Sequence, residues 1–459
     1  MIGRDRRQIR EEQRVREVLR PLRLLAVVAA LAFGVVSCGD DDDDGGGGGG
    51  AAPSAGEEAQ TPSETKCGEG TGEKATGTPI KLGSITTKIP GVDFTDGSDA
   101  AKAFFDCVND NGGIKGHRIQ FIVEEHAVDP QQVASFATKL AESDKVAAFV
   151  AGFSLLDCPV NMKYYEAHDF YPIVAGVPNQ CFQSPNIAAL NMGPLYSSLG
   201  AVRYLVDKAG AKGTMVIISP KQPGIAAVND GALTYAKQKG LKVISRTENV
   251  PIGDPSSLAQ AIVSQAGDGG GVVLDFTPPE GVKILQAAAQ QGLIDRVKWG
   301  SSTPLNDTSV PDAIGSQWDG KLFINAELAL LDTNGPDMQL YRAVNKKYSP
   351  DNPVGSFGQM GFVAAKMFTD TVMELPEDKL NKEGINQAIL NIKNYKTDIL
   401  CKPWYFQEMK LHVPNNTDWT VTPKDGKMVE AEGCTDIPDS FPDLKYVRQF
   451  ESENDVNKG

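Results

Sequence analysis

The chain has 459 residues, of which 41% are hydrophobic and 23% are charged, and its formal net charge is −14. This length predicts more than one domain, and the hydrophobic content excludes an intrinsically disordered chain. The acidic balance argues against nucleic-acid binding, because phosphate contacts need clustered Lys and Arg and no such cluster with interleaved aromatic residues occurs.

The first segment of the chain is typical of an export signal. Residues 4–23 are rich in Arg, and residues 24–36 form an apolar run that is shorter than the roughly 20 residues of a membrane span. The run ends in VVSC, which resembles the lipobox of bacterial lipoproteins, where the Cys becomes the lipid-modified first residue. We therefore expect residues 1–37 to be a signal peptide and Cys38 to be lipidated. The alternative is a plain secretory signal followed by a chance Cys.

A linker is expected at residues 38–78. It contains five Asp residues, then a run of Gly, and then a stretch rich in Ala, Pro, Ser and Glu. Such a composition has nothing to bury and predicts a flexible tether. Its expected role is to hold a folded body away from a membrane surface.

The body begins with a β-α-β pattern. A strand is predicted at 80–85, a loop at 86–97, and a helix that Ser98 or Asp99 caps and that Asn111-Gly112-Gly113 ends. A second strand follows at 118–123. The loop of such a unit lies at the carboxyl end of the first strand, where open parallel sheets bind ligands.

Strands and helices continue to alternate after this unit. Apolar runs such as AAFVA and MVII are typical of strands buried on both faces of a parallel sheet. Two successive blocks of this kind predict two doubly wound α/β lobes, and a third part is expected to cross back between them. The predicted strands are 146–151, 172–175, 187–192, 215–218, 241–245, 271–274, 297–300 and 322–329, and the predicted helices are 130–143, 160–168, one ending at 209, 224–239, 255–265, 280–291, 336–348, 356–375 and 385–392.

Six cysteines remain after Cys38, an even number in an exported chain, which favours disulfides. Proximity in sequence suggests Cys158–Cys181 and Cys401–Cys434, which leaves Cys67–Cys107. Other pairings, or buried free thiols, stay possible at this point. No C-x-x-C pair occurs, so we expect no metal site and no cofactor.

From about residue 78 to 450, the chain resembles the type I periplasmic substrate-binding proteins of ABC importers, especially the branched-chain amino-acid-binding group. The residues that carry the resemblance are IKLGSIT, AAKAFFDCVNDNGGIKGHRIQFIVEEHAVDP, VAAFVAGFS, YYEAHDFYPIVAG and SFGQMGFVAAKMF. It implies an α/β fold of two Rossmann-like lobes joined by three crossovers, with the ligand in the cleft between them. The expected lobes are 79–198 plus 326–378, and 199–325 plus 379–450.

The resemblance also implies a function. Ligand binding would close the hinge between the lobes, and the closed form would be offered to an ABC permease. We expect a monomer, anchored at the extracytoplasmic face of the cell membrane. The same fold can present its ligand to a membrane receptor instead, and the sequence does not separate transport from sensing.

The cleft loops of the family give the expected ligand-binding residues. Of these, Phe153 and Phe357 are equally consistent with ordinary core positions, Pro278 with a helix start, and Gln222 with solvent exposure. A Cys158–Cys181 disulfide would staple two of the loops, which we favour over a redox role. The expected residues are Thr86, Thr87, Phe94, Phe153, Ser154, Leu155, Asp157, Val177, Pro178, Asn179, Gln222, Thr277, Pro278, Ser302 and Phe357.

Two departures from the family pattern concern the ligand. The first-lobe loops read SLLDCP and GVPNQ, with few small hydroxyl residues to hold a carboxylate, and the family's acidic partner for an ammonium group falls near uncharged Ser302. A buried ammonium without a carboxylate costs several kcal/mol, roughly. We therefore expect an amino-acid-like molecule, an amide or a small, partly apolar molecule rather than an ordinary α-amino acid, although Asp157 or Asp275 could serve an amine.

An enzyme is not expected. The four His residues are scattered without H-E-x-x-H spacing, and neither a G-x-S-x-G elbow nor a G-x-x-x-x-G-K-[ST] loop occurs. The glycine-rich stretch 267–271 precedes a strand, whereas a phosphate cradle follows a strand and opens a helix.

Overall fold

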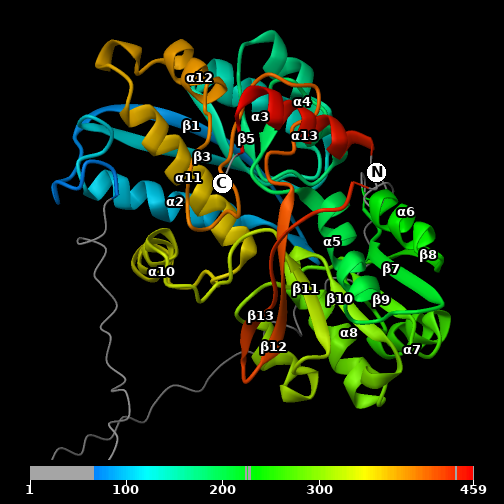
Figure 1. The fold of residues 1–459 in the computed structure, drawn as a ribbon. Coiled ribbons are helices and arrows are strands. Elements are labelled where there is room, and N and C mark those ends of the chain that lie inside the picture. Colours follow the sequence, from blue (N-terminus) through cyan, green and yellow to red (C-terminus); the bar gives the residue numbers. More distant parts are fainter. Residues whose placement is uncertain (1–66, 223–224, 226–228, 440–441, 458–459) are drawn as a thin grey trace, which may run out of the picture. The chain divides into compact units, whose positions relative to one another are not determined.

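The computed structural model describes residues 67–222, 225, 229–439 and 442–457 (Figure 1). The first lobe is built on a sheet with the order β2-β1-β4-β5-β6, in which β3 also pairs with β1. All of these pairings are parallel except β1 with the short β2. The strands are β1 (Gly77–Ile89), β2 (Val92–Asp93), β3 (His117–His126), β4 (Ala148–Gly152), β5 (Ile173–Val174) and β6 (Ala188–Ala189).

The helices of the first lobe come from two separate parts of the chain. Early helices are connected to the strands, and three later helices return to this sheet, where α11 packs on α2 and β4, α10 on α2, and α12 on β4. The helices are α2 (Thr95–Asp110), α3 (Pro130–Thr138), α4 (Asp157–Ala167), α10 (Pro336–Tyr348), α11 (Ser356–Met373) and α12 (Lys382–Leu390).

The second lobe has a seven-stranded sheet with the order β13-β12-β11-β10-β9-β7-β8. The five strands that come first in the sequence, β7 to β11, pair in parallel, and β12 and β13 add an antiparallel hairpin at one edge. The elements are α5 (Gly193–Asp207), β7 (Thr214–Pro220), α6 (Asp230–Gln238), β8 (Lys242–Glu248), α7 (Pro255–Ala266), β9 (Gly271–Leu274), α8 (Pro278–Gln290), β10 (Lys298–Ser301), α9 (Val310–Ile314), β11 (Leu322–Ala326), β12 (Thr417–Lys424) and β13 (Lys427–Asp436).

These two sheets confirm the predicted α/β fold of two lobes. Strands such as β7 and β9 are buried along their length, as expected for parallel strands covered on both faces. The chain passes to the second lobe between β6 and α5, returns after β11, and crosses again before β12, so segments far apart in sequence share each lobe (Figure 1).

The lobe boundaries differ from the expected ones. Helix α5 packs on β9, β10, β11 and β12 of the second sheet, so the first passage lies near Met192 rather than at 198. Helix α12 was assigned to the second lobe, but Asn386 on it donates to the Ala147 carbonyl (2.7 Å) and accepts from the Tyr171 amide (2.9 Å) in the first lobe. Sequence reasoning also missed the hairpin β12–β13 and the last helix, α13 (Pro442–Asn454).

In the first β-α-β unit, the first strand is longer and the helix begins earlier than the sequence suggested. β1 extends to Ile89, and β2 lies inside the segment that was expected to be a loop. Helix α2 begins at Thr95, and the Asp93 carboxylate accepts from the Thr95 amide (2.9 Å) just before it. Ser98 and Asp99 therefore lie within the helix and do not cap it.

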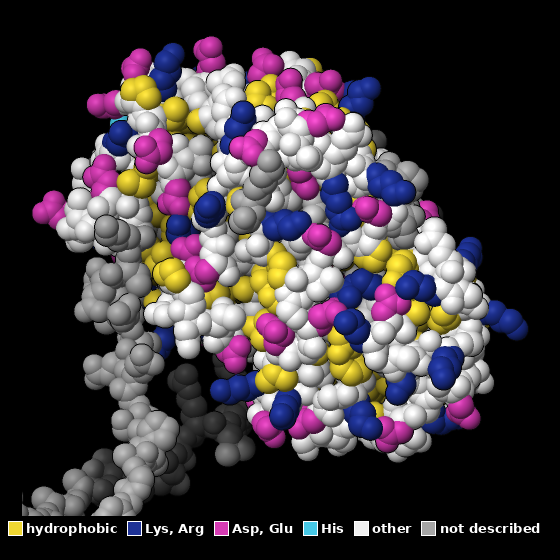
Figure 2. Space-filling model, viewed as in Figure 1, with side chains coloured by type: hydrophobic (Ala, Val, Ile, Leu, Met, Phe, Trp, Pro, Cys, Tyr) yellow, Lys and Arg dark blue, Asp and Glu magenta, His cyan; other side chains and the backbone are white. Residues whose placement is uncertain are grey.

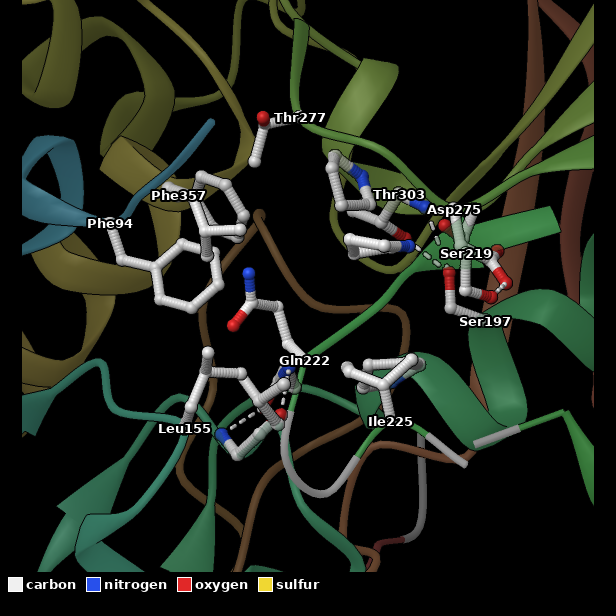
Figure 3. Close-up of a pocket in the computed structure, with 18 of the residues that line it drawn as sticks. Phe94, Leu155, Ser197, Ser219, Gln222, Ile225, Asp275, Thr277, Thr303 and Phe357 are labelled. Carbon is white, nitrogen blue, oxygen red and sulfur yellow. Dashed lines mark hydrogen bonds between the residues drawn. The ribbon is translucent and has the colours of Figure 1, made fainter. Parts of the chain in front are cut away.

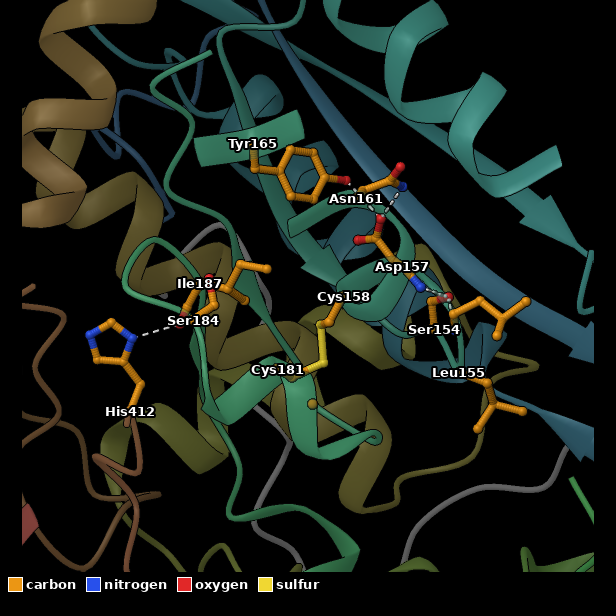
Figure 4. The surroundings of a disulfide bond; sticks show 12 residues. Ser154, Leu155, Asp157, Cys158, Asn161, Tyr165, Cys181, Ser184, Ile187 and His412 are labelled. Atoms are coloured by element: carbon orange, nitrogen blue, oxygen red, sulfur yellow. Dashed lines mark hydrogen bonds between the residues drawn. A yellow bond between two sulfur atoms is a disulfide. The ribbon is translucent and has the colours of Figure 1, made fainter. Parts of the chain in front are cut away.

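Three disulfides occur in the described residues, and they join the pairs that sequence proximity suggested: Cys67–Cys107, Cys158–Cys181 and Cys401–Cys434. Cys158–Cys181 joins the start of α4 to the short turn that follows β5 (Figure 4). It therefore holds together the loops after two neighbouring strands of the first sheet.

The surface of the described residues carries mixed charge. On the face in Figure 2, Lys and Arg side chains alternate with Asp and Glu, and no large field of one sign appears there. Among the described helices, none combines the length and the apolar character that crossing a membrane requires. Within the same residues, no group of three or more His, Cys, Asp or Glu side chains is placed to hold a metal ion.

Candidate functional site

A cavity lies where the strand ends of the two lobes face each other (Figure 3). It holds about 730 Å³ of space not filled by protein atoms, part of it open to solvent. Most of its lining follows the carboxyl ends of parallel strands, the usual ligand position in open α/β sheets. The lining residues are Gly91, Val92, Phe94, Leu155, Gly176, Val177, Asn191, Pro194, Ser197, Ser219, Pro220, Gln222, Ile225, Asp275, Thr277, Ser302, Thr303, Pro304, Glu327, Phe357 and Met360.

One end of the cavity is aromatic and aliphatic. The ring of Phe94 lies 5.2 Å from that of Phe357, centroid to centroid, and Phe153 packs edge-on behind Phe357 at 6.4 Å. Figure 3 shows these two cavity rings and Leu155 on the side opposite Asp275. Such a wall favours an apolar part of a ligand.

The aromatic wall depends on a close approach of α2 and α11. A Cβ at Gly361 would lie 1.8 Å from the Gly97 carbonyl oxygen, and a Cβ at Gly97 would lie 2.2 Å from the ring of Phe153. Glycine at 361 lets the two helices meet at their backbones, and glycine at 97 makes room for the Phe153 ring. This contact fixes Phe94, just before α2, relative to Phe357, in the first turn of α11.

The opposite end of the cavity carries Asp275, which is 9% exposed. Its two carboxylate oxygens accept from the hydroxyls of Ser198 and Ser219, each at 2.8 Å, and Asn229 in turn donates to Ser219 (2.9 Å). Burial raises the pKa of Asp275 to about 6, while these serine hydroxyls act in the opposite direction. The charged form is therefore poorly compensated by the protein itself.

Glu327 is a second buried carboxyl group in the lining, 3% exposed and placed directly after β11. Its Oε2 accepts from the Met192 amide at 2.7 Å. Burial raises the pKa of Glu327 to about 7, and the Met192 amide and the Thr303 and Ser197 hydroxyls lower it in part. Two adjacent residues of α5 thus act on the two carboxyl groups. Ser198 donates to Asp275, and the Ser197 hydroxyl lowers the pKa of Glu327.

Two backbone amides of the first-lobe loops that line the cavity donate within the protein. The Leu155 amide donates to the Thr87 hydroxyl (3.0 Å), and the Gly176 amide donates to the Asn191 side chain (2.7 Å). The Ser154 hydroxyl accepts from the amides of Leu156 and Asp157 at the start of α4. These amides and this hydroxyl are therefore engaged within the first lobe.

Thr87 and Ser154 also share one buried histidine. The Nε2 atom of His126 lies 3.0 Å from the Thr87 hydroxyl and 2.7 Å from that of Ser154. Burial lowers the pKa of His126 to about 4. The neutral ring therefore fastens the ends of β1 and β3 to the loop after β4.

The expected ligand-binding residues divide into three sets. Seven line the cavity: Phe94, Leu155, Val177, Gln222, Thr277, Ser302 and Phe357. Pro278 lines an adjoining cavity that shares Phe357 and Thr277. The structure places the others behind this lining: Thr86, Thr87, Phe153, Ser154, Asp157, Pro178 and Asn179.

Asp157 illustrates why some expected residues lie away from the cavity. Its carboxylate accepts from the Asn161 amide nitrogen (2.7 Å) and the Tyr165 hydroxyl (2.8 Å), and Figure 4 shows these three side chains together, apart from Leu155. Sequence reasoning missed Glu327 and Ser197. Glu327 lay inside the strand predicted at 322–329, whereas the structure ends β11 at Ala326 and so leaves Glu327 at the strand end. Nothing in the sequence marked Ser197 on its helix.

An adjoining cavity extends the acidic character of the site. Its lining includes Asp93, Asp96 and Asp307, together with Gly91 and Phe357, which it shares with the main cavity. Burial first, and then the charges of Asp307 and Asp93, raise the pKa of Asp96 to about 6. None of the described residues that line either cavity is Lys, Arg or His.

Comparisons with known proteins agree with this architecture. A family model described as "Periplasmic binding protein" matches residues 79–427. The fold is similar to that of a branched-chain amino-acid ABC transporter protein from Thermus thermophilus with bound valine (TM-score 0.69, 16% identity, 81% of this chain and 100% of that one). No curated protein sequence matches the chain significantly.

Two further solved structures show the same fold. One is a fatty acid ABC transporter substrate-binding protein from Thermomonospora curvata, with a TM-score of 0.67, 20% identity, and coverage of 82% of this chain and 96% of that one. The other is a solute-binding protein from R. palustris in complex with benzoate, with a TM-score of 0.63, 17% identity, and coverage of 78% and 96%.

Proposed function

The chain belongs to the periplasmic binding protein family, and we propose that it captures a small, partly apolar molecule in the cavity between its lobes and delivers it to an ABC importer from a lipid anchor at Cys38. The family consists of extracytoplasmic solute-binding proteins of ABC importers, not of enzymes. The observation that carries the proposal is the cavity itself, which collects residues after β4, β5, β6, β7, β9, β10 and β11.

Similar structures support an apolar component in the ligand. Two of them hold valine and benzoate, and a third protein is named for fatty acids. Each of these molecules has an apolar body, which the wall of Phe94, Leu155 and Phe357 would accommodate here.

An ordinary α-amino acid suits this cavity poorly. Its carboxylate would need the loop amides and hydroxyls that Thr87, Asn191 and the start of α4 already occupy. An ammonium group does not lack a partner here, although Ser302 is uncharged, because Asp275 and Glu327 supply carboxyl groups in the same lining. We expect leucine, isoleucine and valine to bind weakly, and calorimetric titration giving submicromolar affinity would contradict this.

A thermal-shift screen of the full-length protein tests the binding function. The screen would contain amino acids, amides, ureas, short-chain acids, aromatic acids and amines. A ligand that binds only the folded state at a hundredfold excess over its Kd adds about 2.7 kcal/mol to the free energy of unfolding. We expect one chemical class to raise the Tm by a few degrees. A screen with no stabilising compound would argue against small-molecule capture.

The lipid anchor is tested separately, since Cys38 lies outside the described residues. Cells fed an alkyne analogue of palmitate should label the wild-type protein, and Cys38→Ser should abolish the label. Cys67→Ser, which removes a cysteine of the folded body, is the control and should keep it. Equal labelling of wild type and Cys38→Ser would exclude the anchor.

A further inference from the structure

The charge distribution of the cavity restricts its ligand beyond the proposed function. Every ionisable side chain among the described residues of the lining is acidic: Asp275 and Glu327 in the main cavity, and Asp93, Asp96 and Asp307 in the adjoining one. An anionic ligand would therefore meet repulsion and no cationic partner. A neutral ligand would leave two buried carboxyl groups uncompensated.

The polar contacts of the lining also argue against an anion. The amides of Leu155 and Gly176 donate within the first lobe. In the second lobe, the amide of Ser302 donates to the Leu274 carbonyl (3.2 Å), and that of Thr303 donates to the Ser197 hydroxyl (2.8 Å). These occupied N–H groups cannot form the cradle that an oxyanion needs.

Asp275 and Glu327 are suited to a cation. Neither forms an ion pair with a Lys, Arg or His among the described residues, although Glu280, a comparably buried acid of the same lobe, is paired with Lys283 at 2.8 Å. Their raised pKa values show that the protein alone does not satisfy their charge. A ligand cation would supply the missing partner and favour the ionised form of both groups.

The two ends of the cavity differ in polarity, and this difference indicates how the ligand is oriented. Figure 3 shows Asp275, Ser219, Ser197 and Thr303 gathered on one side, facing Phe94 and Phe357 across the space. We propose that the ligand is an organic amine without a carboxylate, with its cationic nitrogen at Asp275 and Glu327 and its apolar body against Phe94 and Phe357. This inference rests on the proposed function of the same cavity.

The test uses matched probes that differ in charge. The full-length protein is titrated by calorimetry at about pH 8, where an alkyl amine stays protonated and both carboxyl groups are ionised. The probes are 2-phenylethylamine, 2-phenylethanol, 3-phenylpropanoate and phenylalanine. We expect the amine to bind at least about tenfold more tightly than the alcohol, and the anion and the amino acid to bind more weakly than the alcohol. Equal or tighter binding of the alcohol or the anion overturns the proposal.

Two variants of the lining then test where the cationic nitrogen of the ligand binds. Asp275→Asn and Glu327→Gln keep the size of each side chain and should each reduce the affinity for 2-phenylethylamine about tenfold, with little effect on 2-phenylethanol. Asp157→Asn is the control, because Asp157 is equally buried but lies outside the lining. It should leave both affinities unchanged. Amine binding that neither cavity variant weakens would overturn the placement.

The two proposals fail in different ways. If none of the four probes binds but a neutral or anionic compound of the thermal-shift screen does, the amine inference is overturned and the binding function stands. If the screen and the probes both give no ligand, the binding function is contradicted and the inference falls with it. Should a variant not fold, the comparison of the four probes on wild type still decides.

Discussion

The two walls of the cavity handle their polar groups in opposite ways. In the first lobe, the side chains of Asp157, Ser154 and Thr87 form hydrogen bonds with other groups of the same lobe. The wall that faces the cavity presents Phe94 and Leu155 instead. In the second lobe, Asp275 is just as buried, yet it lies in the lining with its serine partners. The polar groups of the first lobe thus bind within the protein, whereas those of the second lobe line the cavity where a ligand can reach them.

The largest effect is expected where the first wall is built. Gly361→Ala places a methyl group against the Gly97 carbonyl, 1.8 Å away before any relaxation, and should lower the free energy of unfolding by about 4 kcal/mol or more. Denaturant unfolding measures this. Gly231→Ala on α6 is the control, because its Cβ would meet Leu195 at an ordinary 3.5 Å. A loss below about 1 kcal/mol for Gly361→Ala would show that α2 and α11 separate easily.

The disulfides offer a second contrast. Replacing Cys158 and Cys181 by Ala should cost about 3 kcal/mol of stability, because the bond closes a loop with a sequence separation of 23. Replacing Cys401 and Cys434, separated by 33, should cost about the same. Only the first pair joins the loops of Leu155 and Val177, so only its removal should weaken ligand binding. Equal losses of affinity in both double variants would contradict this.

The buried acids predict a pH dependence of stability. Burial raises the folded-state pKa values of both Asp157 and Asp275 to about 6, so each binds its proton more tightly in the folded than in the unfolded state. Stability from these groups is therefore highest near pH 4 and falls until about pH 6, by up to about 3 kcal/mol each.

Single variants test that dependence. Asp157→Asn and Asp275→Asn should each flatten the decline of unfolding free energy between about pH 4 and pH 7, measured in denaturant without ligand. A saturating amine should flatten it further in Asp157→Asn, and less so in Asp275→Asn, where only Glu327 remains in the lining to pair with the amine. If the slope of unfolding free energy against pH stayed unchanged in both variants, the charge of each acid would have to be compensated within the folded protein.

The fold was predictable because its signals are local. Buried strands such as β7 and β9 appear as continuous apolar runs, and the alternation with helices predicts parallel sheets. The position of α12 was not predictable, since it depends on Asn386 reaching Ala147, 239 residues earlier in the sequence.

The site was predictable loop by loop but not side chain by side chain. Sequence position indicated the loop of Ser154, Leu155 and Asp157, but only Leu155 reaches the cavity. Ser154 turns to the start of α4, and Asp157 turns to Tyr165, because buried amides and hydroxyls take the nearest acceptor. Glu327 was missed because its amide partner, Met192, comes from a distant passage between the lobes.

The smallest effect is expected at a single bond across the cavity. The Thr277 hydroxyl donates to the Gly91 carbonyl at 3.2 Å, which joins the two walls near the aromatic end. Thr277→Val keeps the shape and removes this bond, so stability should fall by about 1 kcal/mol at most and ligand affinity by up to about fivefold. Thr308→Val is the control, because Thr308 donates to the Val354 carbonyl at 2.9 Å outside both linings. It should change stability similarly and leave affinity unchanged. If Thr277→Val instead reduced affinity more than tenfold, the hydroxyl would have to bind the ligand directly, and polar recognition would extend to the aromatic end of the cavity.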